Sequence, residues 1–305
     1  MKIGYFGDGP WAHDALEQII AAGHSIEFIV ARYGTNDAVL KSLSEFYKIP
    51  YYIFKNVNSD DALNIFDGYR VDLMVSMSFD QILRGGIINL APEGFINCHA
   101  GALPFYRGRN PLNWVLINGE NQFGITVHYI DTGIDTGDII LQRHYPIQSD
   151  DDYAKLLATA IAECPKLLVE AIDHIRNGSV DRKRQHEICA TGSYFRKRKI
   201  GDENIDFKLS AKRCYDFIRG INYPGPGARF NFGGKDFKIL SAKVWEHTSE
   251  VYTLPGQVTN ICRNGNIVGT GQGFLFIEKI CEVGENAIPH IADFQIGSIL
   301  TSPSD

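Results

Sequence analysis

The sequence predicts an α/β fold, in which a doubly wound, mostly parallel, Rossmann-like sheet is followed by a smaller β-rich domain. Strand-like and helix-like segments alternate over the first half of the 305-residue chain, and such alternation produces parallel strands joined by right-handed crossovers. Beyond about Thr191 the pattern changes to short strands separated by glycine turns, which is typical of a small barrel or sandwich. We therefore expect two domains, residues 1–190 and residues 191–305.

The elements of the first domain follow from its hydrophobic periodicity. Alternating apolar residues bounded by turn residues predict strands, and apolar residues at helical spacing predict helices. The expected strands are 2–7, 25–32, 51–54, 71–78, 94–100, 124–131 and 137–147. The expected helices are 10–22, 37–47, 60–66 and 151–177. The last of these contains Pro165, which should kink or split it.

The second domain is expected to contain one helix, 210–221, and then strands within 227–245, 256–261 and 266–280. The first domain is the more informative for function, because open α/β sheets bind ligands beyond the carboxyl ends of their strands. Functional residues are therefore sought directly after each strand of the first domain.

Composition and charge argue against a nucleic-acid-binding, disulfide-bonded or membrane-spanning protein. The net charge of −6 and the pI of about 5.9 argue against a surface built to hold a nucleic acid, which needs clustered Lys and Arg. The six cysteines form no C-x-x-C pair and are expected to be reduced. The sequence shows neither a signal-peptide pattern nor an apolar run near the ~18 residues of a membrane span, so we expect a cytoplasmic protein without a membrane partner.

A polar pair ends the apolar run "GFINCHA", residues 94–100. Asn97 and His99 share one face of a strand there, whereas Cys98 points to the opposite face and is a poor candidate nucleophile. Both polar side chains are expected at the edge where ligands bind. Taken alone, the pair is explained more simply by a histidine bonded to a backbone carbonyl and an asparagine that caps a turn.

The loop "HYIDTGIDTGDII", residues 128–140, adds three aspartates at the same edge. A carboxylate there can hold the imidazole in one tautomer, although Asp, Gly and Thr are also ordinary turn residues. An Asn that donates to an oxyanion, a His that moves a proton and an Asp that orients the His suit direct acyl transfer to an amine. No metal is expected, because ligands at metal spacing are lacking, and His128 is interpreted as a strand residue that faces its own neighbours.

The segments "INCHAGALPFYRGRNP" and "GITVHYIDTGIDTGDII" resemble the formyltransferases that use 10-formyltetrahydrofolate, whose signature is Asn-x-His, Leu-Pro and a later Asp-x-Gly loop. The interval from His99 to Asp135 agrees with the family's spacing. The resemblance implies that Asn97, His99 and Asp135 are catalytic, that 10-formyltetrahydrofolate is the donor cosubstrate, and that no metal takes part.

The resemblance also implies a donor site. It places Arg109 and the loop from residue 131 beside the folate, and it implies that residues 77–83 offer backbone groups to the pterin, although their side chains can equally be core. The residues that it assigns to the donor site are Met77, Asp80, Leu83, Arg109, Asp131, Thr132, Gly133 and Ile134.

The acceptor follows from resemblance to one branch of this family. The segments "YFRKRKIGDENIDF" and "IRGINYPGPGARF" are similar to the OB-like C-terminal domain shared by methionyl-tRNA and nucleotide-sugar formyltransferases. "YRGRNPLNWVLINGE" resembles the amino-arabinose enzyme, whereas the tRNA branch usually has Ala-Ala-Pro in place of Arg109-Asn110-Pro111 and a basic insertion that residues 31–50 lack. The implied partner is a nucleotide-linked (UDP or dTDP) aminodeoxy sugar for surface-polysaccharide (lipopolysaccharide or O-antigen) synthesis, and a homodimer is expected.

Four alternatives stay open at this point. The same trio would serve methionyl-tRNA formylation or hydrolysis of the donor by water. A catalytically silent nucleotide- or folate-binding protein would be expected to lose one of the three polar residues. Dinucleotide-dependent reduction is suggested by Gly7 and Gly9 after the first strand, but Ala12 stands where the third glycine of that motif is expected. The sequence distinguishes neither the nucleotide nor the position of the amine.

Overall fold

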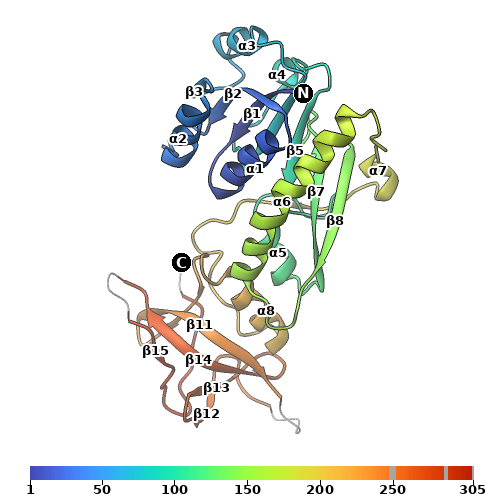
Figure 1. Cartoon of the computed structure of the whole chain (residues 1–305). Helices are drawn as coiled ribbons and strands as arrows, with labels where there is room; N and C mark the ends of the chain where they lie inside the picture. Colours follow the sequence, from blue (N-terminus) through green and yellow to red (C-terminus); the bar gives the residue numbers. More distant parts are fainter. Residues whose placement is uncertain (247–251, 285–287, 304–305) are drawn as a thin grey trace. The chain divides into compact units, whose positions relative to one another are not determined.

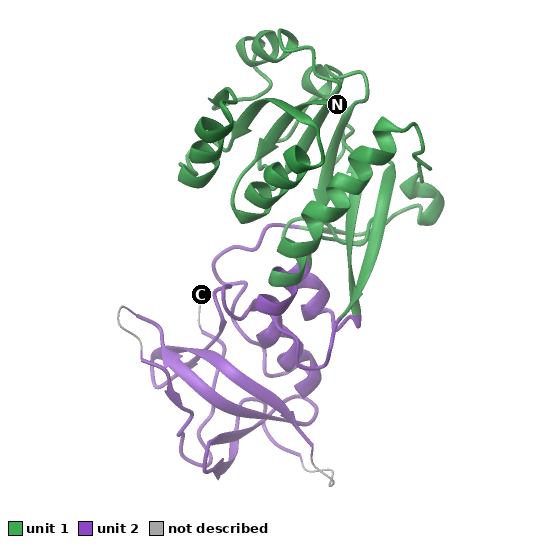
Figure 2. Ribbon diagram, viewed as in Figure 1, with its two compact units in different colours: residues 1–111, 122–146, 158–195 green, residues 112–121, 147–157, 196–305 purple. Residues whose placement is uncertain are grey.

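The computed structural model describes residues 1–246, 252–284 and 288–303. The chain divides into two compact units, shown in Figure 2. Unit 1 consists of residues 1–111, 122–146 and 158–195, and unit 2 of residues 112–121, 147–157 and 196–305. Each unit is therefore discontinuous in sequence, and the domain boundary expected between residues 190 and 191 stays a prediction.

Unit 1 contains a seven-stranded sheet with the order β3-β2-β1-β4-β5-β7-β8 (Figure 1). Its strands are β1 (Lys2–Gly7), β2 (Ser25–Ala31), β3 (Tyr51–Ile53), β4 (Leu73–Met77), β5 (Phe95–His99), β7 (Gln122–Tyr129) and β8 (Ile139–Pro146). The pairs among β1 to β5 are parallel, whereas β7 pairs antiparallel with both β5 and β8. The predicted doubly wound, mostly parallel sheet is confirmed.

The longer helices agree with the predicted ranges to within a few residues. They are α1 (Pro10–Ala21), α2 (Ala38–Tyr47), α3 (Asp60–Asp67) and α6 (Tyr153–Arg176). Asp37 and Ser59 cap α2 and α3, because each side chain accepts a hydrogen bond from a first-turn backbone N–H. α6 runs through Pro165 as one helix, so it is not split.

Short elements complete unit 1 and its boundary with unit 2. They are α4 (Gly85–Ile88), β6 (Arg107–Gly108), α5 (Pro111–Ile117), α7 (Gln185–Ile188) and β9 (Tyr194–Phe195). The sequence patterns did not predict these segments, because each has too few residues to establish a period. β6 and β9 pair in parallel and bring residue 107 beside residue 194.

Helices cover both faces of the sheet of unit 1, and strand alternation decides which side chains face which helix. On one face, the ring centroid of Phe6 lies 5.5 Å from that of Phe66 in α3 and 5.0 Å from that of Phe95. On the other face, the Tyr5 hydroxyl donates a hydrogen bond to the Ala12 carbonyl of α1 at 2.8 Å. Both aromatic side chains of β1 are fully buried, so the core has two layers.

The same alternation separates the polar pair of β5 from its cysteine. Cys98 is buried with its Sγ 3.7 Å from the carbonyl oxygen of Cys164 in α6. Asn97 and His99 lie on the opposite face and pair with His128 and Thr126 of β7. As predicted, Cys98 belongs to the other layer of the fold.

Unit 2 is built on an antiparallel sheet with the order β10-β11-β14-β13-β12, in which β15 pairs with β14. Its strands are β10 (Ala228–Phe232), β11 (Lys235–Trp245), β12 (Val258–Cys262), β13 (Gly265–Gly269), β14 (Phe274–Glu282) and β15 (His290–Ile291). The helix α8 (Ala211–Ile221) begins after a Ser210 cap, and Phe230 and Phe237 stack in the core at 5.4 Å. This confirms the expected β-rich second domain. Of the helices that the structure describes, none is both long and apolar enough to cross a membrane.

Candidate active site

Asn97, His99 and Asp135 come together at the carboxyl end of β5, within unit 1. The Nδ1 atom of His99 lies 3.7 Å from Asp135 Oδ2, and the two side chains are only 8% and 16% exposed. Asn97 reaches the same carboxylate through His128, whose Nε2 is 3.3 Å from Asn97 Nδ2 and 3.6 Å from Asp135 Oδ1. The sequence therefore identified three side chains that share one largely buried site.

The position of Asp135 is fixed through its backbone as well as its carboxylate. Oδ2 accepts a hydrogen bond from the Gly108 N–H at 2.8 Å. The backbone φ of Asp135 is 54°, a value that residues other than glycine adopt infrequently. The buried Gln185 amide donates to the carbonyls of Asp135 and Gly137 at 2.9 and 2.7 Å. Gln185 is held in turn by Arg107, whose guanidinium donates twice to Gln185 Oε1. The strained conformation is thus set by several hydrogen bonds.

His99 is oriented by a backbone carbonyl. Its Nε2–H donates to the Tyr106 carbonyl at 2.7 Å, and because a carbonyl only accepts, the proton of the neutral ring lies on Nε2. A Cβ at Gly101 would lie 2.6 Å from Nε2 and 2.8 Å from the Tyr106 oxygen, so glycine is required for this approach. The ring therefore presents Nδ1, the nitrogen that can gain a proton, toward Asp135.

The structure adds His128 to the predicted trio. Its Nδ1–H donates to the Tyr129 carbonyl at 2.7 Å, so Nε2 is the acceptor for one N–H of the Asn97 amide. Burial lowers the pKa of His128 against the opposing pull of the Asp135 carboxylate. The expectation that His128 faces its own neighbours holds, but those neighbours are Asn97 and Asp135. Only the register of β5 on β7 could have revealed this.

The charge of Asp135 follows from its surroundings. Burial alone would raise the pKa of its carboxyl, but His99 and His128, together with the Gly108 N–H, hold that pKa below its ordinary value. The site therefore contains a carboxylate at neutral pH, next to an imidazole that can become cationic.

Four of the predicted donor residues, Met77, Asp80, Leu83 and Arg109, lie in or beside the segment 78–84, which follows β4. Met77 ends β4 and is buried, and the Leu83 side chain is part of the aromatic core cluster. Those two side chains are therefore core, which is the alternative that the sequence left open. The Arg109 guanidinium donates to the Asp80 carbonyl at 3.0 Å, so both of these residues lie at the same segment.

The backbone of this segment is only partly paired. The carbonyls of Ser78 and Asp80 accept hydrogen bonds from Arg32 and Arg109. In the part of the chain that the structure describes, the backbone N–H and C=O groups of Gln81 and Leu83 have no protein partner. Buried backbone groups are normally paired, so a stretch of free ones is suited to bind a ligand.

The loop 131–134 is closed by Asp131. Its Oδ1 accepts hydrogen bonds from the Gly133 N–H at 3.0 Å and from the Thr136 hydroxyl, an ordinary turn arrangement. Thr132 and Ile134 are exposed, Ile134 to 54%. The loop thus positions Asp135, and contact of Asp131, Thr132, Gly133 and Ile134 with a donor stays a prediction.

The turn after β1 does not present a free anion site. The Gly9 N–H, which would face a pyrophosphate in a dinucleotide site, donates instead to Asp37 Oδ2 at 2.8 Å. Burial opposes ionisation of Asp37, but the N–H groups of Leu40 and Gly9 and the His13 ring lower its pKa below the ordinary value. A carboxylate in this place disfavours a dinucleotide phosphate.

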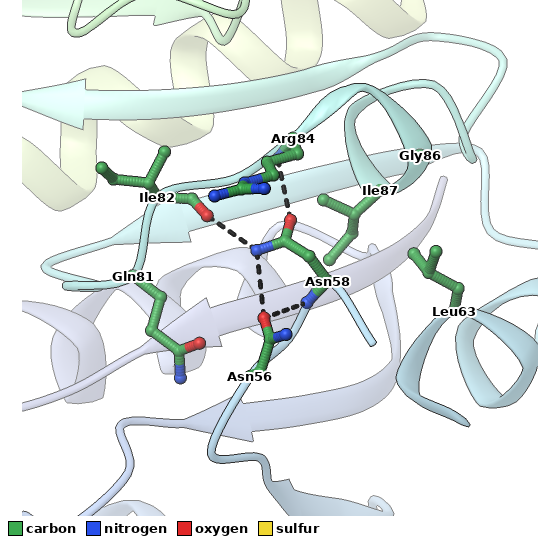
Figure 3. A pocket seen from close by; sticks show the side chains of 8 residues that line it. All are labelled: Asn56, Asn58, Leu63, Gln81, Ile82, Arg84, Gly86 and Ile87. Carbon is green, nitrogen blue, oxygen red and sulfur yellow. Dashed lines mark hydrogen bonds between the residues drawn. The ribbon is translucent and has the colours of Figure 1, made fainter. Parts of the chain in front are cut away.

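A pocket of about 430 Å³ lies beside the segment 78–84 (Figure 3). Its lining residues come from the loop before α3, from α3 itself, and from the region that leads into α4. They are Asn56, Asn58, Leu63, Gln81, Ile82, Arg84, Gly86 and Ile87. Asn97, His99 and Asp135 do not line this pocket. Among the described residues, no group of three or more His, Cys, Asp or Glu side chains could hold a metal ion.

Comparison with known proteins finds family models that match segments of both units. The family model for formyl transferases matches residues 5–172, and the model for the formyl transferase C-terminal domain matches residues 198–294. The methionyl-tRNA formyltransferase of Alkaliphilus oremlandii is 30% identical over 308 residues, which cover 98% of this chain and 97% of that protein. That of Pelotomaculum thermopropionicum is 31% identical over 289 residues, or 92% and 90% of the two chains.

A similar fold is found in a solved structure from another branch. The N-formyltransferase of Helicobacter canadensis, crystallised with folinic acid and dTDP-3-aminofucose, superposes with a TM-score of 0.72 at 21% identity and covers 91% of this chain and 99% of its own. That likeness concerns the fold alone. The family model extends over more than half of the sequence, and the bacterial relatives match nearly all of it. This chain therefore belongs to the formyl transferase family.

Proposed function

We propose that this protein transfers the formyl group of 10-formyltetrahydrofolate to the primary amine of a nucleotide-linked (UDP or dTDP) aminodeoxy sugar. The observation that carries the proposal is the meeting of Asn97, His99 and Asp135 at one buried strand end. Within the same unit, residues 78–84 offer unpaired backbone groups. The first arrangement suits acyl transfer, and the second suits a folate donor.

In the proposed reaction, the neutral amine attacks the formyl carbon, a C–N bond forms, and the carbonyl oxygen becomes an oxyanion. One N–H of the Asn97 amide is bonded to His128, so its second N–H is available to stabilise that oxyanion. Collapse of the intermediate breaks the bond to N10 of the folate. The products are a formamido sugar and tetrahydrofolate.

The proton lost by the attacking amine has to reach the departing N10. His99 accepts it on Nδ1, because Nε2 remains bonded to the Tyr106 carbonyl. The Asp135 carboxylate, 3.7 Å away, stabilises the resulting imidazolium, which gives the proton to N10 as the bond between N10 and the formyl carbon breaks. Asp135 thus acts mainly through its charge, while the Tyr106 carbonyl orients the ring.

Donor binding rests on complementary hydrogen bonding. A pterin carries donors and acceptors along one edge, and these suit the free backbone groups of Gln81 and Leu83. Arg109 and the loop 131–134 would border the rest of the donor. The folate-type ligands crystallised with the enzyme of Helicobacter canadensis and with the sugar 3-N-formyltransferase WlaRD support this assignment.

The sugar acceptor is supported by Arg109-Asn110-Pro111, by the short segment 31–50 and by the net charge of −6, which does not favour a polyanionic RNA. The dTDP-3-aminofucose bound to the enzyme of Helicobacter canadensis agrees with it. Methionyl-tRNA is the second candidate acceptor, because relatives at 30% and 31% identity carry that name. A cytoplasmic homodimer is part of the same proposal.

One preparation decides between these acceptors. The purified protein is given 10-formyltetrahydrofolate with dTDP- or UDP-linked amino sugars or with methionyl-tRNA, and tetrahydrofolate release and the formylated product are measured. A formamido sugar is the expected product. Formylation of methionyl-tRNA alone overturns the sugar proposal, and donor consumption without either acceptor indicates hydrolysis. A His99→Ala variant with near-normal turnover would contradict the proposed proton transfer.

A further inference from the structure

Asn58 joins the loop before α3 to the segment 78–84 through both atoms of its side-chain amide (Figure 3). Its Nδ2 donates to the Ile82 carbonyl at 2.9 Å, and its Oδ1 accepts from the Arg84 N–H at 2.8 Å. The two backbone groups flank Leu83. One planar amide thus fixes the peptide groups on both sides of that residue.

Peptide geometry makes this contact directional. The Ile82 carbonyl and the Leu83 N–H belong to one trans peptide plane and point in opposite directions, as do the Leu83 carbonyl and the Arg84 N–H in the next plane. Because Asn58 holds the outer group of each plane, the N–H and C=O of Leu83 both point away from Asn58. Neither has a protein partner within the described residues.

Asn58 is itself held in place by hydrogen bonds within its own loop and by its position before α3. Its backbone N–H donates to Asn56 Oδ1 at 3.0 Å, and the next residue, Ser59, caps α3. The buried Val57 donates its N–H to Gln81 Oε1 at 3.0 Å, while Gln81 Nε2 donates to the Phe54 carbonyl at 2.8 Å. The two loops are therefore joined by side chains that reach in both directions.

We propose that Asn58 is a positioning residue for the donor: it orients the Leu83 peptide groups so that a ligand with an adjacent hydrogen-bond donor and acceptor binds them. The required ligand edge repeats the pattern of the Asn58 amide itself, as in the heterocycle of a reduced folate. The inference rests on the proposed function, because it assumes that the segment 78–84 binds the formyl donor. It adds a residue that contacts no reacting group and acts only through the backbone that it holds.

The test compares Asn58→Ala with Asn64→Ala. The first substitution removes both bonds to the segment, whereas the second removes an exposed amide of the same size on α3 that contacts neither the segment nor Asn58. The Kd of tetrahydrofolate is measured by calorimetry, and the KM values of donor and acceptor and kcat are measured at saturation. For Asn58→Ala we expect donor Kd and KM to rise on the order of tenfold, about the loss of one or two net hydrogen bonds. We expect acceptor KM and saturated kcat to change less than about twofold by the same scale.

A second readout separates positioning from a merely structural effect. In hydrogen–deuterium exchange, tetrahydrofolate should protect the peptide that covers residues 79–85 in the wild type and in Asn64→Ala, but much less in Asn58→Ala. Wild-type donor affinity and protection in Asn58→Ala would overturn the inference. So would equal losses of affinity and Tm in both variants. If the wild type itself binds no tetrahydrofolate, the proposed function fails and the inference fails with it, whereas a wild type and an Asn58→Ala variant that bind tetrahydrofolate equally well refute the inference alone.

Discussion

Replacing Asp135 by Asn removes one negative charge and keeps the shape of the side chain. The carboxylate lies 3.7 Å from His99 Nδ1 and 3.6 Å from His128 Nε2. Two unit charges ~4 Å apart attract by about 4 kcal/mol at an effective dielectric constant of ~20, which suits a partly buried pair. If this attraction stabilises the imidazolium of His99 in the transition state, its loss reduces kcat by roughly 10³-fold.

The assay measures kcat for D135N at saturating donor and acceptor, with tetrahydrofolate affinity and Tm as checks on the fold. Asp138→Asn is the matched control, since Asp138 lies on the same loop and its side chain contacts neither histidine in the structure. We expect a near-normal kcat for that control. A D135N enzyme that folds, binds tetrahydrofolate normally and loses less than about tenfold in kcat would refute the electrostatic role.

Three further outcomes follow from the same geometry. Gln185→Leu leaves the carbonyls of Asp135 and Gly137 without a donor, so we expect a loss of about 2–4 kcal/mol in unfolding free energy, measured with urea. Gly101→Ala places a Cβ 2.6 Å from His99 Nε2, so kcat should fall at least about tenfold while tetrahydrofolate affinity stays unchanged in calorimetry. The lowered pKa of Asp135 means that the unfolded chain binds its proton more readily. The stability advantage of wild type over D135N in urea titrations should therefore be present at neutral pH, start to fall near the ordinary Asp pKa of about 4, and vanish only below the lowered pKa of folded Asp135; an advantage that stays constant over this acid range would contradict this.

Local rules predicted only part of this site, because they gave the Asn97–His99 pair, whereas the choice of Asp135 among three aspartates came from the resemblance to the formyltransferases. Alternation places Asn97 and His99 on one face of β5. β7 runs antiparallel to β5, so its carboxyl end lies at the opposite end of the pair from His99, and the shared-edge rule for parallel strands does not account for the return of Asp135 to the site. The confirmed sheet of unit 1 followed from the same local patterns.

The rest of the site depends on contacts between distant segments. His128 joins the site only because β7 pairs with β5 in one register, which the periodicity of either strand alone does not specify. Gln185 and Arg107 meet across a long stretch of sequence, from elements too short to show a period. Asn58 likewise gains its partners from a different loop. Such residues carry no local signal, because an isolated amide or imidazole in a loop or strand has many ordinary explanations.

The segment 78–84 has its alternate carbonyls, at Ser78, Asp80 and Ile82, bonded to side chains from other parts of the chain. A ligand bound there meets main-chain atoms, which every amino acid supplies alike. The residues that contact the ligand can then be substituted without loss of ligand binding. If the segment binds the donor as proposed, recognition depends instead on Arg32 and Asn58, which hold its carbonyls, and on Arg109, which holds the Asp80 carbonyl and also borders the donor. Comparing only the residues nearest a ligand would therefore misjudge which relatives can bind it.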